Sequence, residues 1–495
     1  MVMRIRQARI VMLALLIFEA IGSHTAFASD AALSISAEQI RRVDEVFIDS
    51  DRMDSPGMAV GIIQDGRLIY ARGYGSANLE HDIPITAQTV FRTGSIGKQF
   101  TAMCIAILAE RGEISLDDDI RKYLPEMQEY DWPVTIRHLI HHTSGLRGYL
   151  VLQGLAGRVG DYFFTMQEGI DLLSRQKMLN FTPGEKYLYS NSGYFLLGEI
   201  VSRVSGMTLR EFAKRNLFEP LGMNDTHIHD DRNRVVRNRA TGYAPIGEGK
   251  YRIDTTQLEI VGDGSVFTTI EDFFKWDQNF YLNRLGNGTP DLIQMVLTPG
   301  KLNNGEKNKY AFGLYIDTYR GLRRVSHSGS YKGYIAEYTR FPDLKFSVVI
   351  FANTNAVDPD PLAVKVTEIF LGEHFTGEKP TPTALNWQGS REESVRTQDL
   401  SQSKLSEYLG DFFSEELDVT ARLEIEKGEL VMNLVRTSDI LKAVQEDQFI
   451  TTYSNDDAYE LMTRYIEFVR SDGGKVSGFV MQADPIRNLG FEKVH

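Results

Sequence analysis

Predicted strands at both ends of a long helical segment constrain the fold of this chain more than any other feature. Residues 58–63 and 67–72 are strand-like runs, and Asp65-Gly66 between them is typical of a type I′ hairpin turn. A mostly helical, loop-rich middle covers about 91–283. Strands are expected again at 324–328, 334–341 and 345–352. We therefore expect distant segments to complete one antiparallel sheet covered by helices, an α/β (α+β) fold, rather than a doubly wound parallel sheet.

The composition changes after the last of these strands and divides the chain. A helix at about 362–371 closes the first unit, which we place at 29–374, and a polar, Pro-containing linker follows at 375–400. From 401 to 495 the net charge is −8, and strand-like segments alternate with turns at 422–426, 429–434, 466–470 and 476–482. This pattern predicts a C-terminal all-β barrel or sandwich with a solvated acidic surface.

The first 28 residues have the pattern of a signal peptide. Arginines precede an apolar stretch at 10–18, and residues 26–28 have the small-x-small form of a signal-peptidase site. Glu19 interrupts the apolar stretch well short of the about 20 residues that a bilayer requires, which disfavours the alternative of an uncleaved anchor. We expect a mature chain that begins near Ser29, is periplasmic or secreted, and has no membrane span.

Charge and cysteine content exclude several classes of function. The chain has 54 Lys and Arg against 67 Asp and Glu, a net charge of −13, and no long basic cluster, so we expect no nucleic-acid partner. Its one cysteine, Cys104, cannot form an intrachain disulfide or a Cys-rich metal site and lies in an apolar run, where a buried, inert thiol is expected. An exported chain with one cysteine has no partner with which to mispair.

A group of histidines raises the question of a metal site. His138 and His142 are four residues apart, with His141 between them, but the spacing is not His-Glu-x-x-His and no acidic third ligand is evident. The spacing therefore disfavours a metal site, and we expect neither a metal nor another cofactor.

The motif that points most directly to chemistry is Ser95-Ile96-Gly97-Lys98. On the first turn of a helix the two polar side chains share a face, which brings the ammonium close to the hydroxyl. A serine hydroxyl needs a base to become a nucleophile, and a lysine can serve only if its pKa falls about three units from about 10.4. Ser95 and Lys98 are therefore the candidate nucleophile and activator.

The surrounding sequence distinguishes this copy from two others with the same spelling, at 174–177 and 401–404. Ser95 follows a turn and precedes an apolar helix, which places it at a helix N-terminus where backbone N–H groups favour a developing oxyanion. Ser174 instead lies late in a helical segment, and Ser401 opens the acidic β module. The context favours Ser95.

Two further motifs follow along the chain. Tyr189-Ser190-Asn191 lies in a polar loop before a helix, although Tyr-x-Asn also recurs elsewhere in the sequence. His327-Ser328-Gly329 occurs once and falls on a predicted strand, where we expect the glycine to let a substrate backbone approach closely.

In this order the three motifs resemble those of the penicillin-recognising serine hydrolases, specifically the class C β-lactamase-like branch that contains D,D-carboxypeptidases, D-aminopeptidases and related esterases. The resemblance covers about 40–371 and includes the segments 135–146 and 262–273. It implies a β-lactamase/transpeptidase-like antiparallel sheet flanked by helices, with a helical subdomain. The segment from 401 onward is similar, more loosely, to the lipocalin-like barrel appended to some members.

The resemblance also implies roles for individual residues. Ser95 would be acylated and Lys98 would activate it, while Tyr189 would act as a phenolate-like base that also protonates the leaving group. The implied substrate-binding residues are Asn191, which would hold a substrate amide, and His327, Ser328, Gly329 and Ser330. The backbone N–H groups of Ser95 and Ser330 would form the oxyanion hole.

His327 stands where true class C β-lactamases commonly have a lysine. A histidine titrates near pH 6.5, so we expect weaker and more pH-dependent recognition of a substrate carboxylate. This favours an exported hydrolase of amide or ester bonds, acting on D-amino-acid peptides as a D-aminopeptidase or D,D-carboxypeptidase. The alternatives are a β-lactamase-like carboxylesterase, a β-lactamase, and a non-catalytic penicillin-binding sensor.

The expected partner is a small-molecule or peptide substrate. The C-terminal module has three roles open to it: to bind a hydrophobic ligand, to shape the pocket, or to mediate homo-oligomerisation.

Overall fold

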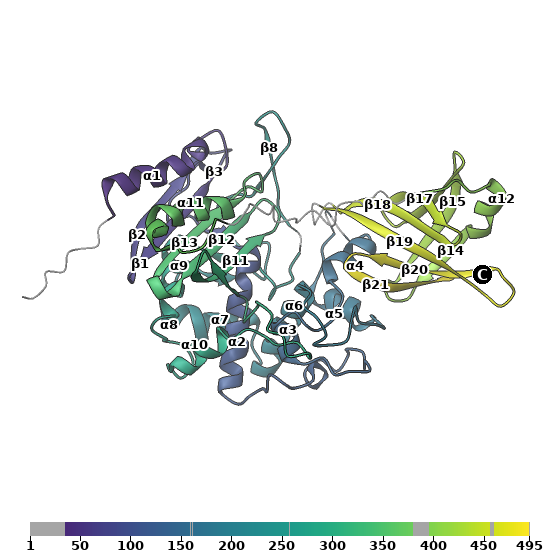
Figure 1. The fold of residues 1–495 in the computed structure, drawn as a ribbon, viewed down its shortest axis with the longest axis horizontal. Coiled ribbons are helices and arrows are strands. Elements are labelled where there is room, and N and C mark those ends of the chain that lie inside the picture. The colour runs from purple at the N-terminus through teal and green to yellow at the C-terminus, as the bar shows by residue number, and fades with distance from the viewer. Residues whose placement is uncertain are drawn as a thin grey trace, which may run out of the picture. The chain divides into compact units, whose positions relative to one another are not determined.

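The computed structural model describes residues 35–494, except 159, 161, 257, 380–395 and 456–459. The expected signal peptide at 1–28 and most of the expected linker lie outside the described residues. Among the helices that the structure does describe, none is both long and apolar enough to span a bilayer. The ribbon contains a helix-covered sheet and a closed β-barrel (Figure 1).

A six-stranded antiparallel sheet forms the centre of the first part, in the order β10-β11-β12-β13-β1-β2. Its strands are β1 (Met58–Gln64), β2 (Arg67–Tyr74), β10 (Tyr315–Tyr319), β11 (Leu322–Ser330), β12 (Ile335–Phe341) and β13 (Phe346–Ala352). Met58 of β1 lies opposite Ala352 of β13, so segments from the two ends of this part pair directly. The prediction of one antiparallel sheet with helices is confirmed, although β10 was not expected and β11 extends beyond 324–328.

The first hairpin has the predicted turn. Gln64 pairs with Arg67, and the two residues between them, Asp65 and Gly66, have φ values of +49° and +79°. Positive φ at both central positions is the geometry of a type I′ turn, whose twist matches that of the flanking strands.

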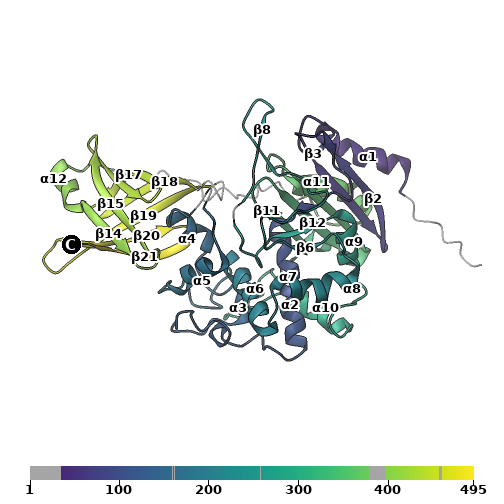
Figure 2. The same cartoon turned by 180° about the vertical axis from the view of Figure 1, so that it is seen from behind.

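Helices cover both faces of this sheet. Successive side chains of a strand point to opposite faces, so Phe346 and Phe351 of β13 face opposite ways. Phe346 packs on Phe370 of α11 (Pro359–Leu371), with ring centroids 5.4 Å apart, and Phe351 packs on Phe273 of α9 (Ile270–Asn279), 5.5 Å apart. Every residue of β13 is consequently buried. Both views show α1 (Ala37–Phe47) beside α11 (Figures 1 and 2).

The helical part is built around α2 (Lys98–Glu110), which is buried along nearly its whole length. A helix that is apolar on all sides requires neighbours on all sides, and α6, α7 and α10 supply them (Figure 2). The other helices of this part are α3 (Ile136–Ile140), α4 (Tyr149–Leu155), α5 (Met166–Ser174), α6 (Asn191–Ser205), α7 (Leu209–Ala213), α8 (Glu219–Leu221) and α10 (Pro290–Val296). Short strands complete it: β3 (Ser76–Asn78), β4 (Ile83–Pro84), β5 (Phe91–Arg92), β6 (His227–Ile228), β7 (Tyr243–Pro245), β8 (Tyr251–Ile253) and β9 (Val266–Thr268).

The C-terminal part is a closed barrel of eight strands that follows the short helix α12 (Gln402–Leu405). The strands are β14 (Gly410–Ser414), β15 (Val419–Glu426), β16 (Glu429–Leu434), β17 (Thr437–Gln445), β18 (Gln448–Asn455), β19 (Glu460–Arg470), β20 (Val476–Ala483) and β21 (Ile486–Lys493). Burial alternates along β15, where Ala421 and Leu423 face inward and Arg422 is exposed. The prediction of an all-β barrel is confirmed, and pairing of β14 with β21 leaves the sheet without a free edge.

Candidate active site

Ser95 lies in a 3₁₀ turn (Gly94–Gly97) that leads directly into α2. The end of β11 packs tightly against this turn: a Cβ added to Gly329 would lie 2.0 Å from the Thr93 carbonyl oxygen and 2.9 Å from the Ser95 nitrogen. A Cβ added to Gly94 would likewise lie 2.7 Å from the Ser330 nitrogen. Both glycines are required because two backbones meet here. For Gly329 this differs from the sequence-based expectation, in which the approaching backbone was that of the substrate.

The same contact brings the two implied oxyanion donors together. Ser95 N lies beside Gly329, and Ser330 N lies beside Gly94, so both N–H groups belong to one junction between the turn and β11. Backbone donors at such a rigid junction are positioned before a substrate arrives, which is the requirement for stabilising an oxyanion.

Lys98 is fully buried, and its ammonium has three oxygen partners. Nζ donates to Ser95 Oγ at 3.0 Å, to Asn191 Oδ1 at 2.7 Å and to the Asp263 backbone carbonyl at 2.6 Å. Burial disfavours the charged form and lowers the pKa of Lys98 to about 8, against a smaller opposing effect of the Asp263 carboxylate. The shift is nearly as large as a lysine needs to act as a base near neutral pH.

Tyr189 lies over the same lysine, with its ring centroid 4.9 Å from Lys98 Nζ, and the Ser95 side chain is close enough to lower the pKa of its hydroxyl. Burial holds the pKa of Tyr189 well above its usual value, despite the opposing effect of Ser95. The phenol is therefore protonated near neutral pH, which differs from the phenolate-like base that the resemblance implied. Asn191, the first residue of α6, uses its carbonyl oxygen on Lys98, so its amide N–H₂ is the group that can donate to a substrate.

His327 is buried, and both of its ring nitrogens are engaged within the protein. Nδ1 donates to the Ser328 carbonyl, because a carbonyl can only accept, and Nε2 then accepts from the Tyr310 hydroxyl at 2.9 Å. Burial, with a smaller contribution from Lys98, lowers the pKa of His327 to about 3. The expectation that His327 titrates near pH 6.5 is therefore wrong: the ring is neutral throughout the physiological range. The reason is burial, which the strand pattern alone did not reveal.

Sequence reasoning assigned no role at the site to Asp263 or His142. Asp263 contributes its carbonyl to Lys98, and its carboxylate accepts from the Tyr149 hydroxyl at 2.9 Å. His142, at a φ of +56°, accepts from Leu188 N through its carbonyl and from Ser190 N through Nδ1, so it holds the backbone on both sides of Tyr189. Both residues lie in segments that carry the resemblance, 262–273 and 135–146, but the spacing of His142 raised the question of a metal and not of this backbone contact.

The histidines considered for a metal have other partners. His138 Nδ1 accepts from Thr135 N at 3.2 Å as part of the capping box of α3, and His141 Nδ1 donates to the Tyr310 carbonyl at 3.0 Å. These contacts use Nδ1 of each ring, and among the described residues no group of three or more His, Cys, Asp or Glu side chains is placed to hold a metal ion.

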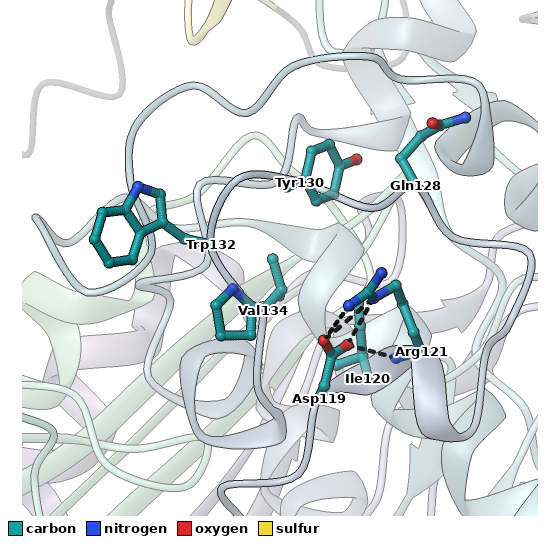
Figure 3. Close-up of a pocket in the computed structure, with 8 residues that line it drawn as sticks. Asp119, Ile120, Arg121, Gln128, Tyr130, Trp132 and Val134 are labelled. Atoms are coloured by element: carbon teal, nitrogen blue, oxygen red, sulfur yellow. Dashed lines mark hydrogen bonds and ion pairs between the residues drawn. The ribbon is translucent and has the colours of Figure 1, made fainter.

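A small hollow away from these residues has no visible role. It is lined by Asp119, Ile120, Arg121, Gln128, Tyr130, Trp132, Pro133 and Val134, and Figure 3 shows the ion pair between Asp119 and Arg121 within it. Its volume of about 10 Å³ has room for about one water molecule, so it is not a substrate site.

Together, a serine at a helix N-terminus, a buried lysine within hydrogen-bond distance and two preorganised backbone donors define a serine acyl-transfer site. The chain belongs to the beta-lactamase family, whose model matches residues 48–368. Homologues with this fold, such as D-aminopeptidases, are serine hydrolases that act through an acyl-enzyme, in agreement with the class predicted from the sequence.

Among curated proteins, the chain is 31% identical over 304 residues to "Penicillin-binding protein 4*" of Bacillus subtilis (strain 168), covering 59% of this chain and 66% of that protein. It is 27% identical over 336 residues to "D-aminopeptidase" of Gluconobacter oxydans (strain 621H), covering 68% and 63%. The chain therefore spans somewhat less than two thirds of the length of these relatives.

Among solved structures, an octameric penicillin-binding protein homologue from Pyrococcus abyssi matches with a TM-score of 0.60 at 24% identity, over 92% of this chain and 98% of that chain. A D-amino acid amidase from Ochrobactrum anthropi SV3 matches with a TM-score of 0.56 at 20% identity, over 68% and 100%. At these identities the matches establish the fold.

Proposed function

We propose that the protein is an exported serine hydrolase that cleaves amide or ester bonds through an acyl-enzyme on Ser95, and that its substrates are D-amino-acid peptides cleaved in the manner of a D-aminopeptidase. The observation that carries this proposal is the buried Lys98, 3.0 Å from Ser95 Oγ with a pKa lowered to about 8. At pH 7 about one molecule in ten then has a neutral lysine that can accept the serine proton.

The pKa values of the two candidate bases assign their roles in acylation. Neutral Lys98 removes the proton from Ser95 Oγ as the oxygen attacks the substrate carbonyl carbon. Tyr189 cannot be this base, because its phenol is already protonated. The carbonyl oxygen becomes an oxyanion beside the N–H groups of Ser95 and Ser330.

Collapse of this intermediate breaks the bond to the leaving group. Tyr189 donates its proton to the departing nitrogen or oxygen and regains one from the Lys98 ammonium, so no charge remains on the phenol. A water molecule then attacks the acyl carbon with Lys98 as its base, which releases the acid and restores Ser95.

The neutral His327 supports the aminopeptidase reaction over the D,D-carboxypeptidase and β-lactamase reactions. Those two act on substrates with a carboxylate beside the bond that breaks, and a lysine at this position would supply a cation for it. His327 has no charge and both nitrogens are engaged, so the site does not favour a carboxylate on the leaving group.

A panel of substrates on the mature protein tests the proposal. We expect kcat/KM to be largest for D-aminoacyl amides and nitroanilides, smaller for their L-enantiomers and peptides that end in D-Ala-D-Ala, and smallest for a chromogenic cephalosporin. Preference for the cephalosporin by a wide margin would replace this function with a β-lactamase. A stable penicillin adduct with no turnover of any amide or ester would identify a sensor instead.

Export and assembly are part of the same proposal. N-terminal sequencing of protein secreted by its host is expected to begin near Ser29. The relative from Pyrococcus abyssi is named as octameric, which supports assembly of this chain into homo-oligomers, and light scattering before and after removal of residues 401–495 tests whether the barrel mediates it.

A further inference from the structure

A cavity of about 390 Å³ has Arg92, three residues before Ser95, and Lys332, two residues after Ser330, in its lining, and its charge is unusual for so acidic a chain. Its lining includes four permanent cations, Arg92, Arg232, Arg239 and Lys332, and two acids, Asp254 and Glu259. Of the two acids, Asp254 accepts a hydrogen bond of 2.7 Å from Gly333 N, which commits part of its carboxylate to the protein. The lining residues carry more positive than negative charge, whereas the whole chain has a net charge of −13.

Arg92 is the innermost of these cations. It is 7% exposed, donates to Ser265 Oγ at 2.8 Å, and lies over the Tyr331 ring with its guanidinium carbon 4.6 Å from the centroid. Its Nε is buried and has no hydrogen-bond partner among the described residues. A buried guanidinium is costly unless anions lie near it, and the Asp263 carboxylate supplies part of that negative charge.

The position of the cavity along the substrate follows from β11. His327 precedes Ser330 by three residues, about 10 Å along a strand, and Lys332 lies two residues beyond Ser330. Tyr189, the donor to the leaving group, lies at the His327 end, with ring centroids 6.2 Å apart. A substrate whose carbonyl lies at Ser330 and whose leaving group points toward Tyr189 therefore extends its acyl part toward Lys332 and the cavity.

We propose that this cavity is the acyl-side subsite of the enzyme and binds a carboxylate on the acyl group, so that the preferred substrates carry an N-terminal D-glutamyl or D-aspartyl residue. The inference rests on the proposed function and adds the substrate class to it. Arg239 and Lys332 approach the carboxylate from the rim, and Arg92 from the interior.

The neighbouring histidine does not alter the charge of the cavity. His229 is also in the lining, and burial, together with the nearby His227, Arg92 and Arg239, lowers its pKa to about 4. Above pH 5 His229 is therefore neutral, and the positive charge of the lining comes from its arginines and lysine alone.

The test compares D-glutamyl and D-glutaminyl p-nitroanilides, which have nearly the same size and differ in charge. We expect kcat/KM to be about tenfold higher for the D-glutamyl substrate, the effect of one charge-assisted hydrogen bond. Arg239→Gln and Lys332→Gln are expected to bring the ratio close to one, mainly through KM. Arg237→Gln is the matched control, because Arg237 is exposed on the same segment but outside the lining, and it is expected to keep the wild-type ratio.

Failure of this inference is distinguishable from failure of the proposed function. If D-leucyl and D-alanyl nitroanilides are hydrolysed but the D-glutamyl to D-glutaminyl ratio is one or less, the subsite is wrong and the aminopeptidase stands. If no D-aminoacyl substrate is hydrolysed, the proposed function is wrong, and the nitrophenyl monoester of glutarate is compared with that of glutaramate. A tenfold preference for the glutarate ester, lost in Arg239→Gln, would support the carboxylate subsite, and equal rates would refute it.

Discussion

The motif Ser-x-x-Lys occurs at Ser95–Lys98 and again at Ser401–Lys404, and the two regions shift the pKa of its lysine in opposite directions. Lys98 is fully buried among three neutral oxygens, which lowers its pKa to about 8. Lys404 is partly exposed and forms ion pairs with Glu446 at 2.7 Å and Glu407 at 3.0 Å, which raise its pKa. The sequence spacing places hydroxyl and amine on one helical turn in both regions, but burial decides whether the amine can be a base.

The serines differ in the same way. Ser401 is the N-cap of α12, where its Oγ accepts from Lys404 N at 3.3 Å, a local role that any short helix can use. Ser95 lies at a junction with β11, a strand more than 200 residues away in sequence. The position of Ser95 thus depends on a long-range contact, whereas that of Ser401 does not.

Substitution of the two serines should give the largest difference in kcat/KM between the two regions. Ser95→Ala is expected to lower kcat/KM by about 10⁴-fold or more, because no group replaces the nucleophile. Ser401→Ala is expected to leave kcat/KM unchanged and to cost about 1 kcal/mol of stability from the lost cap. Nitroanilide assays measure kcat/KM of both variants, and chemical unfolding measures the stability of Ser401→Ala. Mass spectrometry detects a trapped acyl-enzyme, and an adduct on Ser95→Ala would refute the assignment of the nucleophile.

Substitution of the two lysines gives the next largest difference. Lys98→Met retains the apolar volume but removes the base, and a loss of about 10³-fold in kcat is expected. Lys404→Met breaks only partly exposed ion pairs and should not change kcat. Near-UV circular dichroism of both variants checks that the fold is intact. A Lys98→Met enzyme with wild-type kcat would mean that another group is the base.

The junction between the Ser95 turn and β11 can be tested with a matched pair of glycines. Gly94 and Gly112 have φ values of +52° and +72°, so alanine strains both backbones similarly. A Cβ at Gly94 meets Ser330 N, whereas one at Gly112 meets no atom within 4 Å. We expect Gly94→Ala to lower kcat by about 10²-fold through the oxyanion hole and Gly112→Ala to leave it unchanged. Equal kcat values would place the oxyanion donors elsewhere.

The smallest expected difference between the two lysines is in the pH dependence of kcat/KM. Lys98 must be neutral to act, so kcat/KM should fall about tenfold per pH unit below pH 8 and level off above it. The Asp263 carboxylate raises the pKa of Lys98, so Asp263→Asn is expected to move the midpoint to lower pH. Lys404→Met should leave the midpoint unchanged. A midpoint near pH 6.5 that disappears in His327→Gln would mean that His327 titrates in the physiological range after all.

Local sequence predicted those features that depend on local geometry. Asp65-Gly66 was sufficient to predict the hairpin, and helix spacing was sufficient to place Lys98 beside Ser95. The protonation states of His327 and Tyr189 were not predictable, because each results from burial by segments distant in sequence, such as the one that carries Tyr310. The sequence pattern therefore located the candidate reactive groups, whereas their protonation states depend on burial in the fold.

The pairing of β1 with β13 also orders events during folding. β1 is an interior strand, yet its partner includes Ala352, so the sheet cannot form until nearly 300 further residues have left the ribosome. β11 lies on the far side of β13 from β1, and its end supplies the backbone that packs against Ser95. Until then the serine is an ordinary hydroxyl. We therefore expect a chain that ends before β11 to be inert toward acylating compounds, and the first acylation to report the time at which the sheet is complete.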